Sequence, residues 1–116
     1  MKALADKNIF TPDEESAVKE LTNSLKKLLG ERLVKLGLFG SRARGDYDKE
    51  SDIDIAIIVR GLTRELKDQI LNMVADIEFK HIATLSTLVL SEEVFELLKK
   101  RERRIALDIE KEGVPL

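Results

Sequence analysis

Four residues near the middle of the chain have side chains suited to holding a phosphate group and a metal ion: Gly40, Ser41, Asp52 and Asp54. Gly40 leaves the backbone open to a phosphate, and the Ser41 hydroxyl can donate a hydrogen bond to it. Asp52 and Asp54 are two positions apart, so on an extended chain their carboxylates project from the same face. Mg²⁺, or Mn²⁺ in its place, binds such oxygen ligands together with substrate phosphates. The pattern therefore predicts a nucleotide and metal site.

Two arginines follow the Gly-Ser pair. Because a guanidinium group suits phosphate, Arg42 is predicted to face the nucleotide, and Arg44 is a further candidate. The alternative is that both are solvated loop cations. Asp46 and Asp48 are interpreted as loop-forming residues.

Taken together, residues 40–45 (Gly-Ser-Arg-Ala-Arg-Gly) and 51–54 (Ser-Asp-Ile-Asp) resemble the signature of nucleotidyltransferases of the DNA polymerase beta superfamily. The longer first segment is similar to the minimal nucleotidyltransferases of bacteria and archaea. This resemblance covers roughly residues 36–59. It implies that Gly40 and Ser41 hold nucleotide phosphates and that Asp52 and Asp54 bind Mg²⁺. It also implies transfer of a nucleoside monophosphate, AMP from ATP, to a protein or other acceptor, with release of pyrophosphate.

The chain departs from this family at one position. Many members have a third carboxylate on the strand after the long helix, whereas residues 85–90 contain no acid. Glu78 is the nearest acidic residue upstream, but it belongs to a helical pattern. The alternative function is therefore a catalytically inactive nucleotide-binding or interaction subunit that regulates its partner by contact. The resemblance implies a helical HEPN-domain protein as that partner, with this chain as the antitoxin of the pair.

Other polar residues have simpler interpretations. Gly-Ser is usually only a turn and Asp-x-Asp usually a solvated strand end, and it is their occurrence together that favours function. The single histidine, His81, is interpreted as a helix-end or surface residue. The basic cluster at residues 99–104 is interpreted as a solvated helix face, with a partner surface as the alternative.

Composition limits the remaining possibilities. With 116 residues, of which 43% are hydrophobic and 36% charged, we expect one domain, residues 1–116, with a substantial core. The net charge of -2 argues against a broad nucleic-acid surface, and the absence of cysteine excludes disulfides and thiolate metal sites. No apolar run is long enough to span a membrane and residues 1–10 lack the apolar centre of a signal peptide, so a cytoplasmic location is expected. An oligomer is compatible with the sequence.

The periodicity of apolar residues predicts the elements that position the site. A capping box at residues 11–14 begins a helix that ends near Gly30. Strands are expected at 33–39, 53–59 and 85–90, with the second apolar on both faces and therefore central. Residues 40–50 are expected to form a structured loop, residues 62–77 a helix, and residues from Ser91 to about 110 a final helix. The fold class is α/β (α+β): a small mixed sheet with helices packed on it, like the polymerase beta palm by resemblance.

Overall fold

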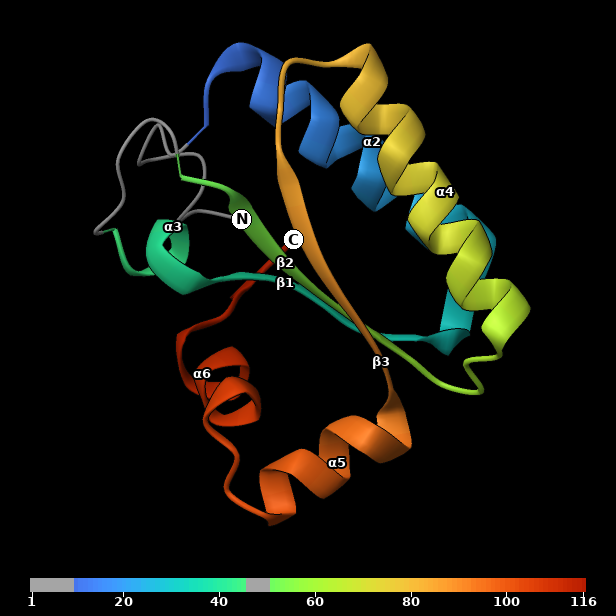
Figure 1. Ribbon diagram of the computed structural model, residues 1–116, viewed down its shortest axis with the longest axis vertical. Helices are drawn as coiled ribbons and strands as arrows, with labels where there is room; N and C mark the ends of the chain where they lie inside the picture. Colours follow the sequence, from blue (N-terminus) through green and yellow to red (C-terminus); the bar gives the residue numbers. More distant parts are fainter. Residues whose placement is uncertain (1–9, 46–50) are drawn as a thin grey trace.

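The computed structural model describes residues 10–45 and 51–116 of the chain. They form a four-stranded mixed sheet with helices on both faces, which confirms the predicted fold class (Figure 1). The signal-peptide prediction concerns residues 1–10, of which only Phe10 lies in this part, and the predicted loop residues Asp46 and Asp48 lie outside it. Among the described helices, none has the length and apolar character needed to cross a bilayer.

The first described helix, α2 (Pro12–Leu29), begins at the predicted capping box. The Glu14 amide donates to Thr11 Oγ1 at 3.1 Å, and the Thr11 amide donates to Glu14 Oε1 at 2.9 Å. These bonds satisfy two amide groups that a helix start otherwise leaves without acceptors. The helix ends at Gly30, whose φ of 54° suits glycine, and the short 3₁₀ helix η1 (Gly30–Arg32) leads into the sheet.

The sheet has the order β3-β2-β1-β4. Its strands are β1 (Leu33–Phe39), β2 (Ile53–Val59), β3 (Leu85–Ser91) and β4 (Val114–Pro115). β1 pairs antiparallel with β2 and β4, and β2 pairs parallel with β3. The first three strands and the central place of β2 were predicted. β4 was missed because two residues ending in proline carry no strand pattern.

Two layers of helix cover the sheet (Figure 1). On one face, α2 and α4 (Arg64–Lys80) pack against the alternate β2 residues Ile53, Ile55 and Ile57. On the other face, α5 (Glu92–Lys100) and α6 (Arg104–Glu112) pack against Ala56 and Ile58. Both sets of β2 side chains are fully buried, as expected for a central strand. The α5–α6 side has the smaller core.

The predicted final helix is wrong in one respect, because it is two helices. The chain turns at residues 101–103, where Glu102 has a φ of 55°, and α6 then begins at Arg104. The break allows Phe95 of α5 and Ile109 of α6 both to reach the same small core, which one straight helix could not do. Residues 40–44 of the predicted loop also form a helical turn, α3 (Gly40–Arg44).

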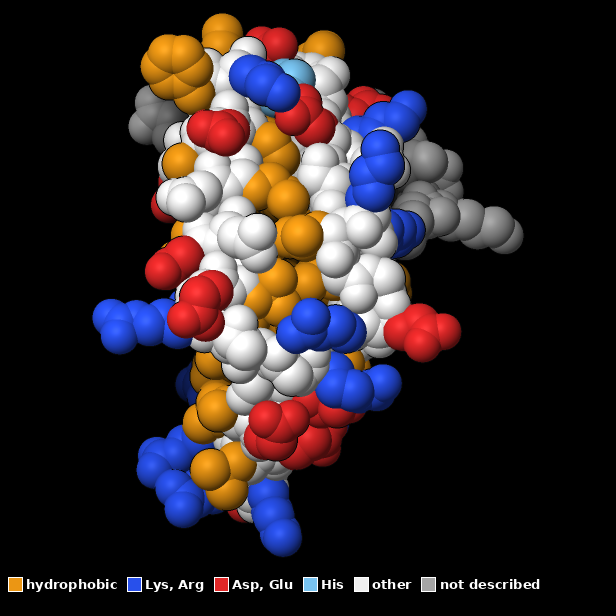
Figure 2. All heavy atoms as spheres, turned by 90° about the vertical axis from the view of Figure 1, so that its right-hand side faces the viewer, with side chains coloured by type: hydrophobic (Ala, Val, Ile, Leu, Met, Phe, Trp, Pro, Cys, Tyr) orange, Lys and Arg blue, Asp and Glu red, His pale blue; other side chains and the backbone are white. Residues whose placement is uncertain are grey.

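The surface of the α2–α4 layer carries several apolar side chains. Figure 2 shows a band of hydrophobic side chains between charged ones on the side of the molecule where α4 lies. Leu28 on α2 is 38% exposed and Leu71 on α4 is 41% exposed. Phe79, at the end of α4, is 94% exposed. Helices α2 and α4 therefore carry apolar side chains on their outer surface as well as in the core.

Candidate active site

The two halves of the motif meet at one end of the sheet. β1 ends at Phe39, which lies opposite Asp54 in the antiparallel register, so Gly40 follows directly beside Asp54. A Cβ atom at position 40 would overlap the Asp54 carboxylate and lie 3.1 Å from its Cγ. Gly40 also has a φ of +75°, a conformation that residues with a side chain rarely adopt. Two features therefore favour glycine at position 40: the positive φ and the lack of space for a Cβ atom beside the Asp54 carboxylate.

Ser41 lies in the first turn of α3, at the end of β1. The first amide groups of a helix have no acceptors within the helix, and Phe39 at the N-cap supplies no side-chain acceptor for them. Amide groups in such a position can point to phosphate oxygens. Gly45, with a φ of 88°, ends α3 after little more than one turn.

Asp52 and Asp54 differ in their surroundings. Asp52 is exposed and precedes β2, whereas Asp54 is the second residue of that strand and is half-buried. Burial raises the pKa of Asp54, and repulsion from Asp52 raises it further. A hydrogen bond from Ser86 and attraction to Arg44 and Arg42 oppose this rise in pKa without cancelling it. The two carboxylates are thus close enough to repel each other, and a cation would relieve that repulsion.

The donor set fits Mg²⁺, which is usually held by one or two carboxylates and completes its shell with water and substrate phosphates. Within residues 10–45 and 51–116, no group of three or more acidic, histidine or cysteine side chains is arranged to hold a metal ion. The pair Asp52 and Asp54, beside the Gly40 turn, could supply two oxygen ligands to a metal that also binds nucleotide phosphates, and this role stays a prediction.

Ser86 occupies the place on β3 that is next to Asp54. The parallel register pairs these residues, so their side chains project from the same face, and the Ser86 side chain is hydrogen-bonded to the Asp54 carboxylate. Glu78 does not join this cluster. Its Oε2 atom accepts a hydrogen bond from the Leu85 amide at 2.9 Å and so holds the beginning of β3. Sequence reasoning missed Ser86, since the register between two strands distant in sequence has no local signal.

Arg42 is buried, with 2% of the residue exposed, and has partners on two other segments. Its NH1 and NH2 atoms bind Glu14 Oε1 and Oε2 at 2.9 and 3.1 Å, and NH2 also donates to the Ser51 carbonyl oxygen at 2.7 Å. Burial alone would raise the pKa of Glu14, but hydrogen bonds from Arg42 and Thr11, with attraction to Arg42, lower it overall. The interaction ties α2, α3 and the segment before Asp52 together. Nucleotide binding by Arg42 stays a prediction.

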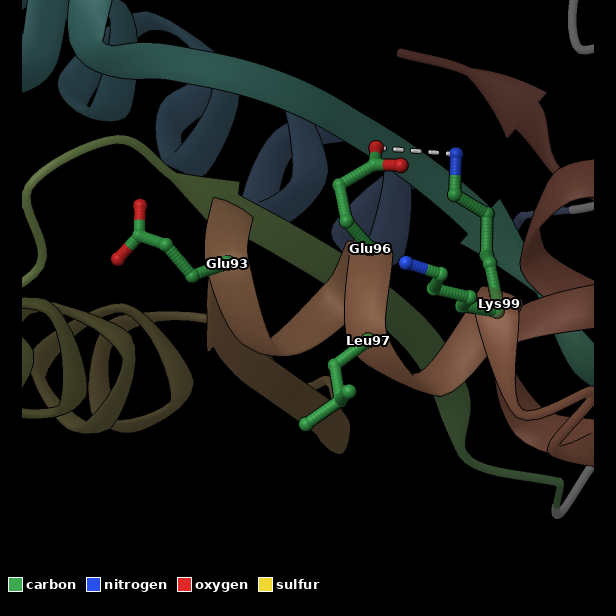
Figure 3. A pocket seen from close by; sticks show the side chains of 5 residues that line it. Glu93, Glu96, Leu97 and Lys99 are labelled. Atoms are coloured by element: carbon green, nitrogen blue, oxygen red, sulfur yellow. Dashed lines mark ion pairs between the residues drawn. The ribbon is translucent and has the colours of Figure 1, made fainter.

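The remaining candidates contact acidic side chains at or near the surface. Arg44 NH1 pairs with Glu112 Oε2 of α6 at 3.2 Å. His81 follows α4, and its Nε2 atom lies 3.0 Å from Glu20 Oε1, in agreement with a helix-end position. In the basic cluster, Lys99 pairs with Glu96 on α5 at 3.0 Å, at a shallow depression that contains no motif residue (Figure 3).

The chain is similar in sequence to a family of known proteins. Residues 18–114 match the nucleotidyltransferase domain family. Two proteins of Methanocaldococcus jannaschii, each named "putative protein adenylyltransferase", are similar to the chain. The first is 41% identical over 83 residues, which are 72% of this chain and 79% of that protein. The second is 34% identical over 73 residues, which are 62% of this chain and 74% of that protein.

A solved structure has the same fold. It is the crystal structure of a "putative nucleotidyltransferase" from Sulfolobus solfataricus, with a TM-score of 0.55 and 27% sequence identity. The alignment covers 86% of this chain and 76% of that one. The family match spans most of the described strands and helices, including both halves of the motif. The chain therefore belongs to the nucleotidyltransferase domain family of the DNA polymerase beta superfamily.

Proposed function

We propose that this protein is a Mg²⁺-dependent adenylyltransferase that moves AMP from ATP to a hydroxyl group of an acceptor protein. The observation that carries the proposal is the contact between the two halves of the motif: the Asp54 carboxylate lies against Gly40 at the start of α3. A phosphate bound at this turn would lie beside the carboxylates. The names of the two Methanocaldococcus relatives support a protein as the acceptor.

Each residue has a defined part in this reaction. Gly40, Ser41 and the first amides of α3 bind phosphate oxygens, and Asp52 and Asp54 provide the metal ligands. Mg²⁺, when bound, neutralises charge that develops on the transferring phosphoryl group. The acceptor oxygen attacks the α-phosphorus and forms a P–O bond, while the bond from that phosphorus to the bridging oxygen of the β-phosphate breaks. Pyrophosphate leaves, and the hydroxyl proton passes to a carboxylate or to solvent.

A second candidate function is a nucleotide-binding subunit that regulates its partner by contact without transfer. The observation that favours it is that Ser86, rather than an acid, stands next to Asp54. Two carboxylates still suffice to hold Mg²⁺ with the help of phosphates, and so we place transfer first.

The two functions differ in what happens to the acceptor. The protein is incubated with Mg²⁺, isotope-labelled ATP and a HEPN-domain protein from the same organism, the class of partner that the motif resemblance implies. Intact mass of that partner is then measured. We expect the partner to gain AMP, and to gain none with Asp52→Asn/Asp54→Asn; Asp76→Asn, an exposed acid on α4, serves as the matched control. Inhibition of the partner without ATP, and equally by the double variant, would establish contact regulation instead.

A further inference from the structure

β3 is an edge strand with little protection against pairing. It lies at one end of the strand order, and no described strand pairs with its outer side. Its seven residues, Leu-Ser-Thr-Leu-Val-Leu-Ser, include no charge and no proline. Natural proteins usually place charges, prolines or bulges on such edges because an open edge accepts further strands. An uncharged edge of this length is therefore suited to bind another chain.

The hydrogen bonds of β3 show which backbone groups face outward. The Ile53 amide donates to the Thr84 carbonyl oxygen at 3.0 Å, so the backbone groups of residue 84 face β2. Because this direction alternates along a strand, those of Leu85, Thr87 and Val89 face the open edge. The Leu85 amide is already bound by Glu78. Thr87 and Val89 thus present the groups with which an added strand would pair.

This edge leads directly to the candidate active site. Ser86 is in register with Asp54 and hydrogen-bonded to it. A residue opposite Ser86 on an added strand would project from the same face, one strand spacing of about 4.8 Å farther out. A side chain at that position would be two strand spacings, about 9.6 Å, from β2, so a long hydroxyl side chain such as Tyr could extend across Ser86 toward the two carboxylates.

The other end of the edge opens into a groove of about 520 Å³ between α4, β3 and α5. Its walls include the apolar residues Leu71, Val89 and Val94. Arg64 and Lys67 also line it, and neither forms an ion pair with any described residue, while Asp68 is the single acid there. The groove is therefore complementary to an apolar side chain accompanied by an acidic one.

We propose that the acceptor binds as an extended protein segment that adds to β3 as another strand. Its hydroxyl residue lies opposite Ser86, and an apolar residue next to an acid enters the groove beside Val89. Ser86 faces the α5–α6 side and Val89 the α2–α4 side, so the two acceptor residues are three positions apart. This inference rests on the proposed adenylyl transfer. It adds the position at which the acceptor binds and the sequence pattern of the acceptor segment.

Synthetic peptides test the spacing without knowledge of the natural acceptor. Fluorescent peptides carry one Tyr and one Leu-Glu pair in a background of Ala and Gln, which have neither a hydroxyl group nor a large apolar side chain. They differ in whether Leu is three or four positions from Tyr, on either side. Binding is measured by anisotropy, and AMP transfer to the same peptides by mass. We expect the three-position peptide to bind at least about tenfold more tightly, because a one-residue slip turns the Leu to the wrong face.

Two sets of variants locate the bound peptide. N-methylation of the peptide amides that face β3 should weaken binding about tenfold, whereas methylation of those that face away should not, since only the first are hydrogen-bonded. In the protein, Leu71→Lys should weaken binding while Leu28→Lys, at a similarly exposed residue outside the groove, should not. Lys67→Glu should weaken binding of the peptide that contains Glu and should strengthen binding of a peptide in which Lys replaces that Glu.

The outcomes separate this inference from the proposed function. AMP transfer that is independent of spacing and of methylation leaves the enzyme intact and overturns the docking site. Spacing-dependent binding without transfer supports docking on β3 and counts against adenylyl transfer. Absence of binding at every spacing overturns the inference. The inference is also overturned if analytical ultracentrifugation shows a dimer and Thr87→Pro converts it to a monomer. In that case a second copy of the chain occupies the β3 edge.

Discussion

At the scale of single residues, the site depends on a close contact between a glycine and a carboxylate. The sequence suggested that Gly40 leaves room for a phosphate. In the structure, the Asp54 carboxylate fills part of the space that a side chain at position 40 would need. A substitution at Gly40 should consequently affect the proposed metal ligand Asp54 as well as the proposed phosphate-binding turn.

We predict that Gly40→Ala lowers both the free energy of unfolding and the affinity for Mg²⁺-ATP. The positive φ alone should cost about 1–2 kcal/mol, and displacement of Asp54 adds to it. Gly45→Ala is the matched control, because Gly45 has a φ of +88° with nothing within 4 Å of an added Cβ. Chemical denaturation and calorimetry of both variants separate the two effects. Equal loss of ATP affinity in the two variants would show that the Asp54 contact is unimportant.

The raised pKa of Asp54 predicts a dependence of stability on pH. An acid whose pKa is higher in the folded than in the unfolded state destabilises the fold when it is ionised. This destabilisation is present above the folded pKa and disappears as the pH falls through it and on through the unfolded pKa. Without metal, Asp54→Asn should therefore be more stable than the parent at neutral pH, and the difference should shrink on acidification. Denaturation between about pH 3 and about pH 8, which reaches from the ordinary titration of carboxylates to neutral pH, measures the difference. A less stable Asp54→Asn protein at neutral pH would contradict the assignment.

At the scale of elements, the motif is positioned by α2, which contributes no residue to the predicted site. Glu14 completes the capping box of α2 and binds Arg42 of α3, and Arg42 also holds the Ser51 carbonyl oxygen just before Asp52. One buried ion pair thus fixes the turn and the start of β2 relative to the first helix. The capping role of Glu14 could be recognised from sequence, but its second partner is 28 residues away.

We predict that Glu14→Gln lowers the free energy of unfolding by about 3 kcal/mol, because it removes the carboxylate that pairs with a buried guanidinium. Glu15→Gln, at an exposed position on the same helix, should change it by less than about 0.5 kcal/mol. The effect of Glu14→Gln should also decrease as the pH falls through the lowered pKa of Glu14, since the parent loses the same charge there. Equal stability of the two variants at neutral pH would show that the ion pair does not hold the site together.

The sequence predicted the long elements well because each has a clear period. Helix α2 and strands β1, β2 and β3 follow from residue spacing and capping chemistry. What was missed depends on contacts between distant segments: the α5–α6 break serves a shared core, β4 pairs with β1, and the place of Ser86 follows from the register with β2. The motif residues were identifiable, but their supporting partners were not.

At the scale of the whole molecule, the two faces and the two ends of the sheet have different roles. The α2–α4 face carries the larger core, and the smaller core under α5 and α6 borders the face from which Asp54 and Ser86 project. The motif gathers at the end where β1 stops and β2 and β3 start. The site is thus built on rigid strands next to an open edge. This arrangement supports the proposal that the acceptor is a protein segment.

The measurement that tests the central claim most directly is calorimetric titration of ATP into the purified protein, with Mg²⁺ and with excess chelator. If Asp52 and Asp54 share a metal with the nucleotide, ATP binds with Mg²⁺, and binding is lost with chelator and in the Asp52→Asn/Asp54→Asn variant. Asp76→Asn should bind as the parent does, and circular dichroism should show that both variants are folded. Equal ATP affinity in excess chelator, or in a folded double variant with Mg²⁺ present, would contradict the account.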